Sequence, residues 1–312
     1  MGADEGIPLH RRLSKILGGP SVSLLILAGL IGVAGGYGAI LFRYLIQLVN
    51  HLAFPGGIGL DELSALPWYW VVLPPAVGGL VVGPMVYFLA REAKGHGVPE
   101  VMEAVTLRGS VIRKRIVVIK SFASAISIGT GGSVGRVGPI VQIGSAIGSV
   151  VGQLLNLSPV RLRTLVCCGA AAGIAATFNA PIAGSMFALE IILGDFGLST
   201  FSPIVISAVS ATAVSRHFLG NTPAFIVPSH ELVSAWELPM YVVLGFFCSL
   251  AAVAFTRALY FSEDGFDAIT IPEYWKAAIG GLILGAMGLL YPHILGVGYP
   301  AMDMALMEEI SL

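Results

Sequence analysis

The 312-residue sequence contains few charged residues. Asp, Glu, Lys and Arg together make up 11% of it, whereas soluble globular domains carry about 25%. Hydrophobic residues make up 56%, and the mean hydropathy is +0.87. This balance excludes an ordinary soluble domain and predicts an all-α integral membrane protein in a lipid bilayer, because helices satisfy their own backbone groups in lipid. The formal net charge of −1 gives no indication of a nucleic-acid partner, and none is expected.

The sequence also lacks the motifs of an intramembrane hydrolase or a metalloenzyme. Its six histidines show no H-E-x-x-H spacing, there is no G-x-S-x-G motif, and residues 129–137 do not end in the G-K-[ST] of a P-loop. We therefore expect no catalytic residue, no metal and no cofactor, and predict that the protein is not an enzyme. The apolar segments hold almost no carboxylate besides Glu190, which argues against a cation transporter.

Cysteine is scarce as well. The three cysteines, Cys167, Cys168 and Cys248, all lie in apolar runs, and adjacent Cys167 and Cys168 cannot readily bridge each other. A free cysteine in such a run behaves as a small hydrophobic residue. We predict three buried thiols and no disulfide.

The sequence is rich in long apolar segments. A perpendicular membrane helix needs about 20 residues, and four segments reach or approach that length: 21–52, 68–90, 237–261 and 274–291. Shorter apolar helices are predicted at 117–128, 139–155, 164–178, 181–193 and 203–215. Short pieces in a membrane chain suggest discontinuous helices that meet partway through the bilayer.

Basic residues predict how the chain is oriented in the cell membrane. His10, Arg11, Arg12 and Lys15 precede the first span, which places the N-terminal segment 1–19 in the cytoplasm. A second basic cluster comprises Arg108, Arg113, Lys114 and Arg115. Topology is its plain explanation, since cytoplasmic loops are rich in Lys and Arg. A dedicated lipid- or anion-binding surface is the alternative.

The most informative stretch is glycine-rich and runs from Gly129 to Gly144, with Arg136 as its single charge. The apolar run from Pro139 predicts a new helix with proline in its first turn. A helix that begins inside a membrane directs unpaired N–H groups and the positive end of its dipole at what lies before it. The stretch therefore predicts an anion site made of backbone.

A second helix start of this kind is predicted at Gly95-His-Gly-Val-Pro99, a glycine-flanked turn that feeds a helix too short to span. Glu100 and Glu103 in its opening turns are typical of a helix N-terminus. The chain thus offers two helix starts that face the membrane interior, the second approached from the cytoplasmic side.

An internal repeat is visible in the glycine pattern. Gly78-Gly-Leu80 recurs 202 positions later as Gly280-Gly-Leu282, and Gly95-His-Gly-Val-Pro99 recurs 201 positions later as Gly296-Val-Gly-Tyr-Pro300. Repeats in a membrane chain suggest a channel or transporter built from two related halves. We divide the chain into 1–19, a first membrane repeat 20–218, a connecting loop 219–236 and the start of a second repeat 237–312. A counterpart of 129–155 is missing, so we expect the sequence to be partial.

Three segments in order resemble signatures of the CLC family of chloride channels and chloride/proton antiporters. Gly135-Arg-Val-Gly-Pro139 is similar to GREGP, Gly95-His-Gly-Val-Pro-Glu100 to GSGIP, and Phe178-Asn-Ala-Pro-Ile-Ala-Gly184 to FNAPLAG. The spacing from Lys120 to the first signature is also similar, and the resemblance covers about residues 20–306. It implies an inverted-repeat bundle with broken, re-entrant helices, a homodimer, and one anion pathway per subunit.

The resemblance also implies where chloride is bound. The helix starts after His96 and after Arg136 would point at the anion, which gives the site residues His96, Gly97, Val98, Arg136, Val137, Gly138 and Pro139. Val137 stands at the gating position, where the family has a glutamate that competes with chloride and carries protons. Ile191 stands where antiporters have the inner proton acceptor. The family's later GxFxP segment and pore tyrosine lie beyond Leu312.

Both proton stations are therefore replaced by apolar side chains, and the expected function is a passive transmembrane chloride channel. The alternatives are a chloride/proton antiporter, a fluoride-type transporter, or a non-conducting truncated homologue. Three residues keep two interpretations each. His96 either faces the anion or is a hydrated loop residue, Arg136 either lines the pathway or neutralises carbonyls, and Glu190 is either a packing residue or a proton carrier.

Overall fold

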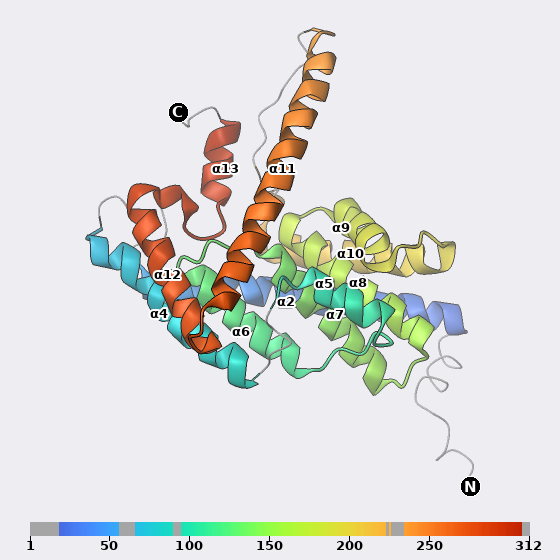
Figure 1. Ribbon diagram of the computed structural model, residues 1–312. Helices are drawn as coiled ribbons and strands as arrows, with labels where there is room; N and C mark the ends of the chain where they lie inside the picture. Colours follow the sequence, from blue (N-terminus) through green and yellow to red (C-terminus); the bar gives the residue numbers. More distant parts are fainter. Residues whose placement is uncertain (1–18, 56–65, 90–94, 223–224, 226–233, 308–312) are drawn as a thin grey trace.

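The computed structural model describes residues 19–55, 66–89, 95–222, 225 and 234–307, and within these ranges it contains helices and turns but no strand (Figure 1). In chain order the α-helices are α2 (Pro20–Ala53), α4 (Trp68–Leu89), α5 (Val98–Thr106), α6 (Arg115–Gly129), α7 (Val137–Leu154), α8 (Pro159–Phe178), α9 (Pro181–Phe187), α10 (Leu198–Leu219), α11 (Glu237–Ala268), α12 (Glu273–Leu290) and α13 (Tyr299–Leu306). A π-helix, η2 (Ala188–Leu193), follows α9, and a 3₁₀ turn, η3 (Pro292–Ile294), follows α12.

Six helices of the described residues are long and apolar enough to cross a membrane: α2, α4, α7, α8, α10 and α11. The all-α membrane fold is thus confirmed. Prolines inside α4, at Pro74, Pro75 and Pro84, do not end that helix, since neighbouring helices can satisfy the freed backbone groups in a membrane protein.

The predicted breaks between short helices are present. α6 ends at Gly129 and α7 begins at Val137, so residues 130–136 of the glycine-rich stretch form the turn between them. α8 ends at Phe178, the next residue, Asn179, adopts the left-handed conformation (φ 57°, ψ 34°), and α9 begins at Pro181. Asparagine tolerates this conformation and proline suits a first helical turn, so the local sequence accounts for the break. The π-helical continuation of α9 was not predicted.

Three predicted helix boundaries are wrong by five residues or more. α8 begins at Pro159 rather than at 164. α10 begins at Leu198 rather than Pro203, which lies inside the helix as its sixth residue. A membrane helix tolerates an internal proline because neighbouring elements can satisfy the freed backbone group. α11 continues from the predicted end at 261 to Ala268, through Glu263, Asp264 and Asp267. Apolarity marks the part of a helix that can be buried in lipid, and a polar extension of the same helix has no such signal.

The core of the bundle lies around α8, whose small residues allow close packing. Ala170, Ala171 and Ala172 are completely buried. A Cβ added at Gly144 of α7 would collide with the carbonyl oxygen of Gly169 of α8, and one added at Gly169 would collide with that of Gly144. The two backbones therefore touch, as expected of helix pairs in membranes with small residues at their interface. α2 and α10 pack on the other sides of α8.

α4 and α12, which carry the repeated glycine pattern, pack against each other (Figure 1). A Cβ on Gly79 would collide with the carbonyl oxygen of Ala277, and one on Gly281 would collide with that of Pro75. Gly281 and Ala277 lie 202 positions after Gly79 and Pro75. The contact is thus reciprocal between the two copies, as a two-fold relation between the copies requires.

α11 differs from the other long helices because none of its residues is buried. Figure 1 shows it rising away from the body of the bundle. The prediction of three buried thiols is therefore wrong for Cys248, which is exposed on α11, while Cys167 and Cys168 are buried in α8. An apolar run does not distinguish a helix packed on protein from one whose surface is covered by lipid, because lipid tails are as apolar as leucine.

Candidate anion site

The two predicted helix starts lie together in the structure. α5 begins after Gly97, which has a positive φ of 97°, and α7 begins after Arg136. A Cβ on Gly97 would collide with the carbonyl oxygen of Gly138, and one on Gly138 would collide with the carbonyl oxygen of His96. Only glycine at both positions lets the two backbones approach this closely. The contact brings Gly97 and Val98 next to Val137, Gly138 and Pro139.

The start of α7 presents open backbone donors. Ile140 N–H donates to the carbonyl of Arg136, which is the first bond of the helix, and Pro139 has no N–H. Among the described residues, no acceptor is recorded for the N–H groups of Val137 and Gly138. Such unpaired donors together with the helix dipole favour an anion.

The start of α5 is occupied differently. The carboxylate of Glu100 accepts a hydrogen bond from the Gly97 N–H at 2.6 Å, which is the arrangement of a capping box. The Gly97 amide, one of the predicted anion contacts, is therefore bound by a side chain of its own helix. Sequence reasoning recognised Glu100 as a helix-start residue and missed its bond to the predicted site.

The side chains at the site are mostly apolar. Val98 and Val137 are partly buried and pack against the main hydrophobic core, so the predicted gating position carries no titratable group. His96 is exposed, while its carbonyl oxygen faces Gly138. Glu190 and Ile191 lie in η2, and both are exposed. The structure thus keeps these last two residues on a separate element from the helix starts.

Arg136 connects the start of α7 with the start of α13. Its Nε donates a hydrogen bond to the hydroxyl of Tyr299 at 3.2 Å, and the guanidinium carbon lies 4.4 Å from the centre of the same ring. Tyr299 is the first residue of α13 and the repeat counterpart of Val98. A guanidinium over an aromatic face is attracted by the ring quadrupole. Of its two interpretations, this geometry favours a structural role for Arg136, although the bond is to a side chain rather than to carbonyls.

Lys120 holds the turn that precedes α5. Its side chain is buried, and Nζ donates to the carbonyl oxygen of Gly95 at 2.9 Å. Sequence reasoning noted Lys120 only for its spacing. The sequence did contain a signal for this role, since Lys120 is a lone cation inside the apolar run of α6. A buried charge requires a partner, so a bond to a polar group could have been expected.

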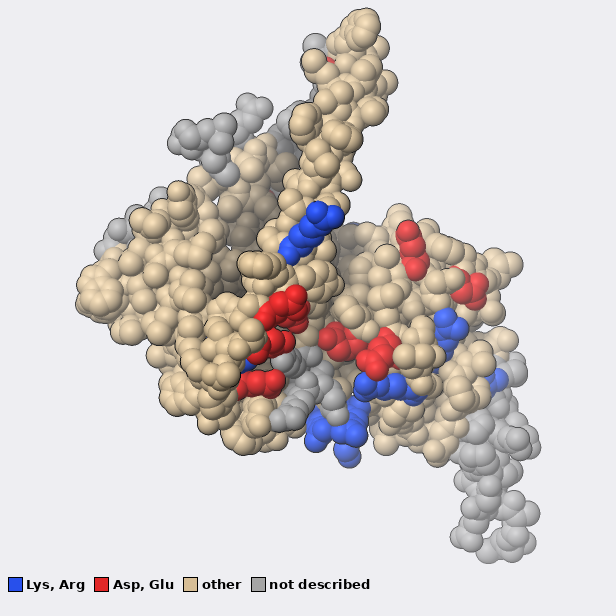
Figure 2. Space-filling model, in the orientation of Figure 1, with Lys and Arg blue, Asp and Glu red and all other residues tan. Residues whose placement is uncertain are grey.

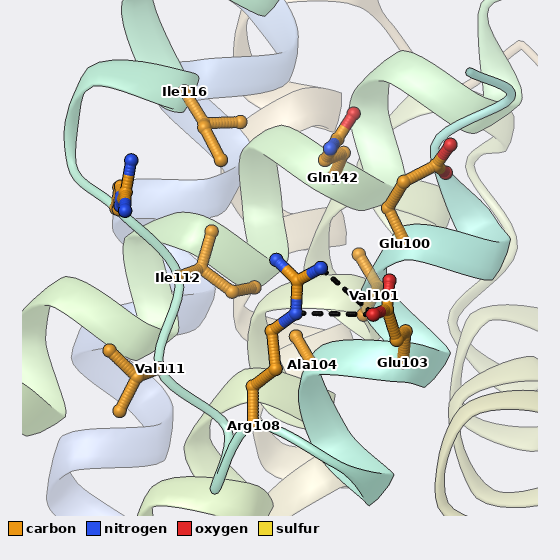
Figure 3. Close-up of a pocket in the computed structure, with 10 residues that line it drawn as sticks. Glu100, Val101, Glu103, Ala104, Arg108, Val111, Ile112, Ile116 and Gln142 are labelled. Atoms are coloured by element: carbon orange, nitrogen blue, oxygen red, sulfur yellow. Dashed lines mark hydrogen bonds and ion pairs between the residues drawn. The ribbon is translucent and has the colours of Figure 1, made fainter. Parts of the chain in front are cut away.

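A cavity of about 510 Å³ opens beside the site, between α5, the loop that follows it and α7. Figure 3 shows Glu100 and Gln142 lining it, with Glu103 and Arg108 joined by an ion pair of 2.8 Å. Gln142 is buried, and its Oε1 has no partner among the described residues. The cavity gives solvent a route to Glu100, the carboxylate that caps Gly97.

No group of three or more His, Cys, Asp and Glu residues is placed to hold a metal ion in the described part of the chain. The site as described consists of backbone N–H groups, one capping carboxylate and apolar walls. Such an arrangement can bind and release a small anion and holds no nucleophile activated by a base.

The sequence is similar to curated chloride channels and exchangers. A putative chloride channel protein, ClcB-like, from Ralstonia nicotianae is 34% identical over 285 residues, which cover 90% of this chain and 66% of that protein. The H(+)/Cl(−) exchange transporter ClcA of Vibrio parahaemolyticus is 31% identical over 285 residues, 89% of this chain and 60% of that protein. The chain thus spans less than two thirds of the length of these relatives.

The fold is also found among solved structures. The crystal structure of a slow cyanobacterial Cl−/H+ antiporter superposes with a TM-score of 0.80 over 92% of this chain and 68% of that chain, at 23% sequence identity. At this identity the likeness shows the fold alone. A family model for voltage-gated chloride channels matches residues 78–312, well over half of the chain. The three motifs, the broken helices and this match agree: the chain belongs to the voltage-gated chloride channel (CLC) family.

Proposed function

We propose that the chain forms part of a transmembrane chloride channel whose anion site lies where α5 and α7 begin. The observation that carries this proposal is the backbone contact between Gly97 and Gly138. It places the positive ends of two helices at one point. Each helix end is equivalent to roughly half an elementary charge. The carboxylate of Glu100 already binds the α5 end, so the open attraction for an anion comes mainly from the start of α7.

Backbone provides this attraction better than a side chain would. A free arginine beside the site would bind chloride through a full charge and slow its release, whereas conduction needs binding weak enough for the ion to leave. The guanidinium of Arg136 donates to the Tyr299 hydroxyl and lies over its ring, contacts that hold it in place without neutralising it. The open N–H groups of Val137 and Gly138 are the backbone donors at the site.

We infer that conduction is passive. The resemblance assigns proton transfer to glutamates at the positions of Val137 and Ile191, and neither side chain can bind a proton. Relatives are named both as channels and as exchangers, so a chloride/proton antiporter remains the first alternative. A fluoride-type transporter and a non-conducting homologue are the others.

The remaining expectations of the family resemblance form part of the proposal. The chain would reside in the cell membrane with its N-terminus in the cytoplasm, because Arg11, Arg12 and Lys15 precede the first span. It would assemble as a homodimer with a separate anion pathway in each subunit.

The proposal is tested by anion flux from liposomes that contain the purified protein. With a chloride gradient and an ionophore to dissipate the membrane potential, chloride should leave at a rate that does not depend on a pH gradient. A proton gradient that drives chloride uphill would instead establish the antiporter. The same assay with fluoride in place of chloride shows which of the two anions leaves the liposomes faster. The absence of any flux would favour a non-conducting homologue.

Val137→Glu tests the assignment of the gating position. A carboxylate at this helix start would compete with chloride when ionised, so chloride flux should fall as the pH rises through the range in which a glutamate ionises, near its usual pKa of about 4.3. Val160→Glu, at an exposed residue of α8, adds the same charge away from the site and should leave the pH profile unchanged. Equal pH profiles in the two variants would separate Val137 from the pathway.

A further inference from the structure

The cavity of about 510 Å³ beside α5 contains a buried polar group that lacks a partner. Gln142 of α7 lines this cavity and exposes only 2% of its surface, and its Oε1 accepts no hydrogen bond from the described residues. Figure 3 shows Gln142 with Ile116 and Glu100 on either side of it. A buried acceptor without a hydrogen bond is costly. The orphaned oxygen therefore indicates that the cavity holds a hydrogen-bond donor.

Gln142 belongs to a row of polar side chains on one face of α7. Ser145, Ser149 and Gln153 follow it at spacings of three and four residues, which places them on the same side of the helix. Ser149 Oγ accepts from Ile112 N–H at 2.9 Å, and Gln153 Nε2 donates to the Ile112 carbonyl oxygen at 2.9 Å. Gln142 and Ser145 each keep a buried oxygen without a partner in the described part of the chain. The loop after α5 thus satisfies the polar side chains that it reaches, and it does not reach Gln142.

The charged groups of the lining are already engaged within the protein. Glu100 accepts from the Gly97 N–H at 2.6 Å, and Glu103 pairs with Arg108 at 2.8 Å. Arg113, the other charged residue of the described lining, also interacts within the protein. These two acids and two bases carry no net charge, and Figure 2 shows acidic and basic side chains next to one another in the lower part of the molecule. The lining therefore favours neither a cation nor an anion.

The rest of the described lining is apolar. Val101 and Ala104 of α5, together with Ile112 and Ile116, are buried, and Val111 is exposed. Small-molecule sites of about 300–1,000 Å³ commonly combine such apolar walls with a few polar groups that fix the orientation of the ligand. Water alone could satisfy an orphaned amide but would leave these walls hydrated. A compact apolar body with one donor group fits both parts of the lining.

We propose that this cavity binds a neutral molecule with a hydroxyl group on a short apolar body, of the class of alcohols and phenols. The hydroxyl donates to Gln142 Oε1, and the apolar body lies along Val101, Ala104 and Ile112. A hydroxyl also accepts hydrogen bonds, so it satisfies the amide whichever of its O and N atoms faces the ligand. The inference rests on the cavity and on Gln142 and does not depend on anion transport, so either proposal can fail without the other.

Fluorine NMR titration of the purified protein in detergent micelles with 4-fluorophenol tests the proposal, after correction for partition of the probe into protein-free micelles. 4-Fluoroanisole, in which a methoxy group replaces the hydroxyl, is the matched probe that cannot donate. 4-Fluorophenol should bind more tightly by about two- to ten-fold, the value of one hydrogen bond. 4-Fluorobenzylammonium, which carries a positive charge, should bind more weakly than 4-fluorophenol.

Gln142→Leu should remove the difference between the phenol and the anisole, because it removes the acceptor and keeps a side chain of similar size. Gln47→Leu makes the same change at an exposed residue of α2 that does not line the cavity, and the difference should remain. Gln142→Met, with a more flexible side chain, repeats the binding test in case leucine does not fit.

The stability of the variants shows whether the amide has a structural role instead. Gln142→Leu removes an acceptor that has no partner, so without a ligand its melting temperature should equal or exceed that of the unmodified protein. Gln153→Leu makes the same change on the same face of α7 and should melt at a lower temperature, because the Ile112 carbonyl oxygen loses its donor.

The proposal is wrong if 4-fluorophenol and 4-fluoroanisole bind equally to the unmodified protein, or if Gln142→Leu and Gln47→Leu leave the same difference between the two probes. A melting temperature of Gln142→Leu as low as that of Gln153→Leu would also overturn it, because the amide would then have a partner in the protein. No saturable binding of 4-fluorophenol would mean that the cavity holds only water. Tighter binding of the ammonium probe would show that the lining selects a cation.

Discussion

The short helices α5 and α13 begin with related sequences and similar backbone geometry, yet their surroundings differ. Gly97 and Gly298 both have positive φ angles, of 97° and 79°. Each then accepts the first bond of its helix, from Val101 N–H in one copy and from Met302 N–H in the other. The turn and the helix start are therefore properties of the local sequence.

The elements that surround the two helices come from distant parts of the sequence. α5 packs on α7 and η2, and Val101, Ala104 and Val105 are buried. α13 has no buried residue within its described span, and neither does α11. The described residues contain no counterpart of α6 to α10 on which the second copy could pack. Burial of a helix start, and with it an enclosed anion site, thus depends on helices distant in sequence.

The α4–α12 contact is the same on both sides, because a glycine of each helix touches a carbonyl oxygen of the other. Disrupting it should lower the free energy of unfolding more than the other substitutions considered below. Gly79→Ala and Gly281→Ala each place a Cβ against a carbonyl oxygen of the partner helix. We expect each to lower the free energy of unfolding by about 1–3 kcal/mol, the usual cost of overpacking. Denaturant unfolding in detergent micelles measures the change.

Gly280→Ala is the matched control, because a Cβ at Gly280 meets no atom within 4 Å. It should be neutral or slightly stabilising, since alanine is the better helix former. If Gly79→Ala and Gly281→Ala lower the free energy of unfolding by different amounts, the two sides of the contact are alike in backbone geometry but not in their contribution to stability.

The Arg136–Tyr299 pair is the contact in which the two short helices differ most, since Val98 is the counterpart of Tyr299. Tyr299→Phe removes the hydroxyl that accepts from Arg136 and keeps the ring under the guanidinium. We expect a loss of about 0.5–1.5 kcal/mol in unfolding free energy, the net value of one hydrogen bond. Tyr299→Leu should lose more, because the attraction to the ring also disappears. No difference between the two variants would mean that the ring contributes nothing.

The starts of α5 and α13 also differ in charge, because only α5 carries a capping carboxylate. Glu100 caps α5, whereas its counterpart in α13 is Ala301. Glu100→Gln removes a negative charge next to the proposed site and should raise chloride affinity about two- to five-fold, in line with the effect of one charge at a helix end. Calorimetric titration with chloride measures it.

Glu103→Gln provides the control for that experiment. It removes a carboxylate from the same helix that pairs with Arg108 rather than with the helix start. Chloride affinity should change less than in Glu100→Gln. Equal increases would indicate a general effect of surface charge rather than the loss of the charge that caps the start of α5.

Most of the fold could be predicted from local sequence. Asn179 followed by Pro181 predicted the break between α8 and α9, and Pro139 predicted the start of α7, because these residues restrict the backbone where they stand. The end of α11 and the start of α10 were misplaced because apolarity does not report where a helix stops. The exposure of Cys248 was missed because lipid and protein are equally apolar surroundings.

The proposed site was predictable in part. Glycine at 97 and 138 predicted backbone exposed at a helix start, and the structure adds that the two glycines meet each other. The bond from Arg136 to Tyr299 joins residues 163 positions apart, and no pattern within either segment indicates it. Long-range partners of polar side chains depend on the packing of whole helices, which a single sequence does not specify.

The central claim, that anions bind where the starts of α5 and α7 touch, is tested most directly by chloride titration of Gly138→Ala and Gly135→Ala. The first variant pushes a Cβ into the carbonyl oxygen of His96, whereas a Cβ at Gly135 meets no atom within 4 Å. The account predicts that chloride binding, followed by calorimetry on folded protein, is lost in Gly138→Ala and retained in Gly135→Ala. Equal chloride affinity in the two variants would contradict it.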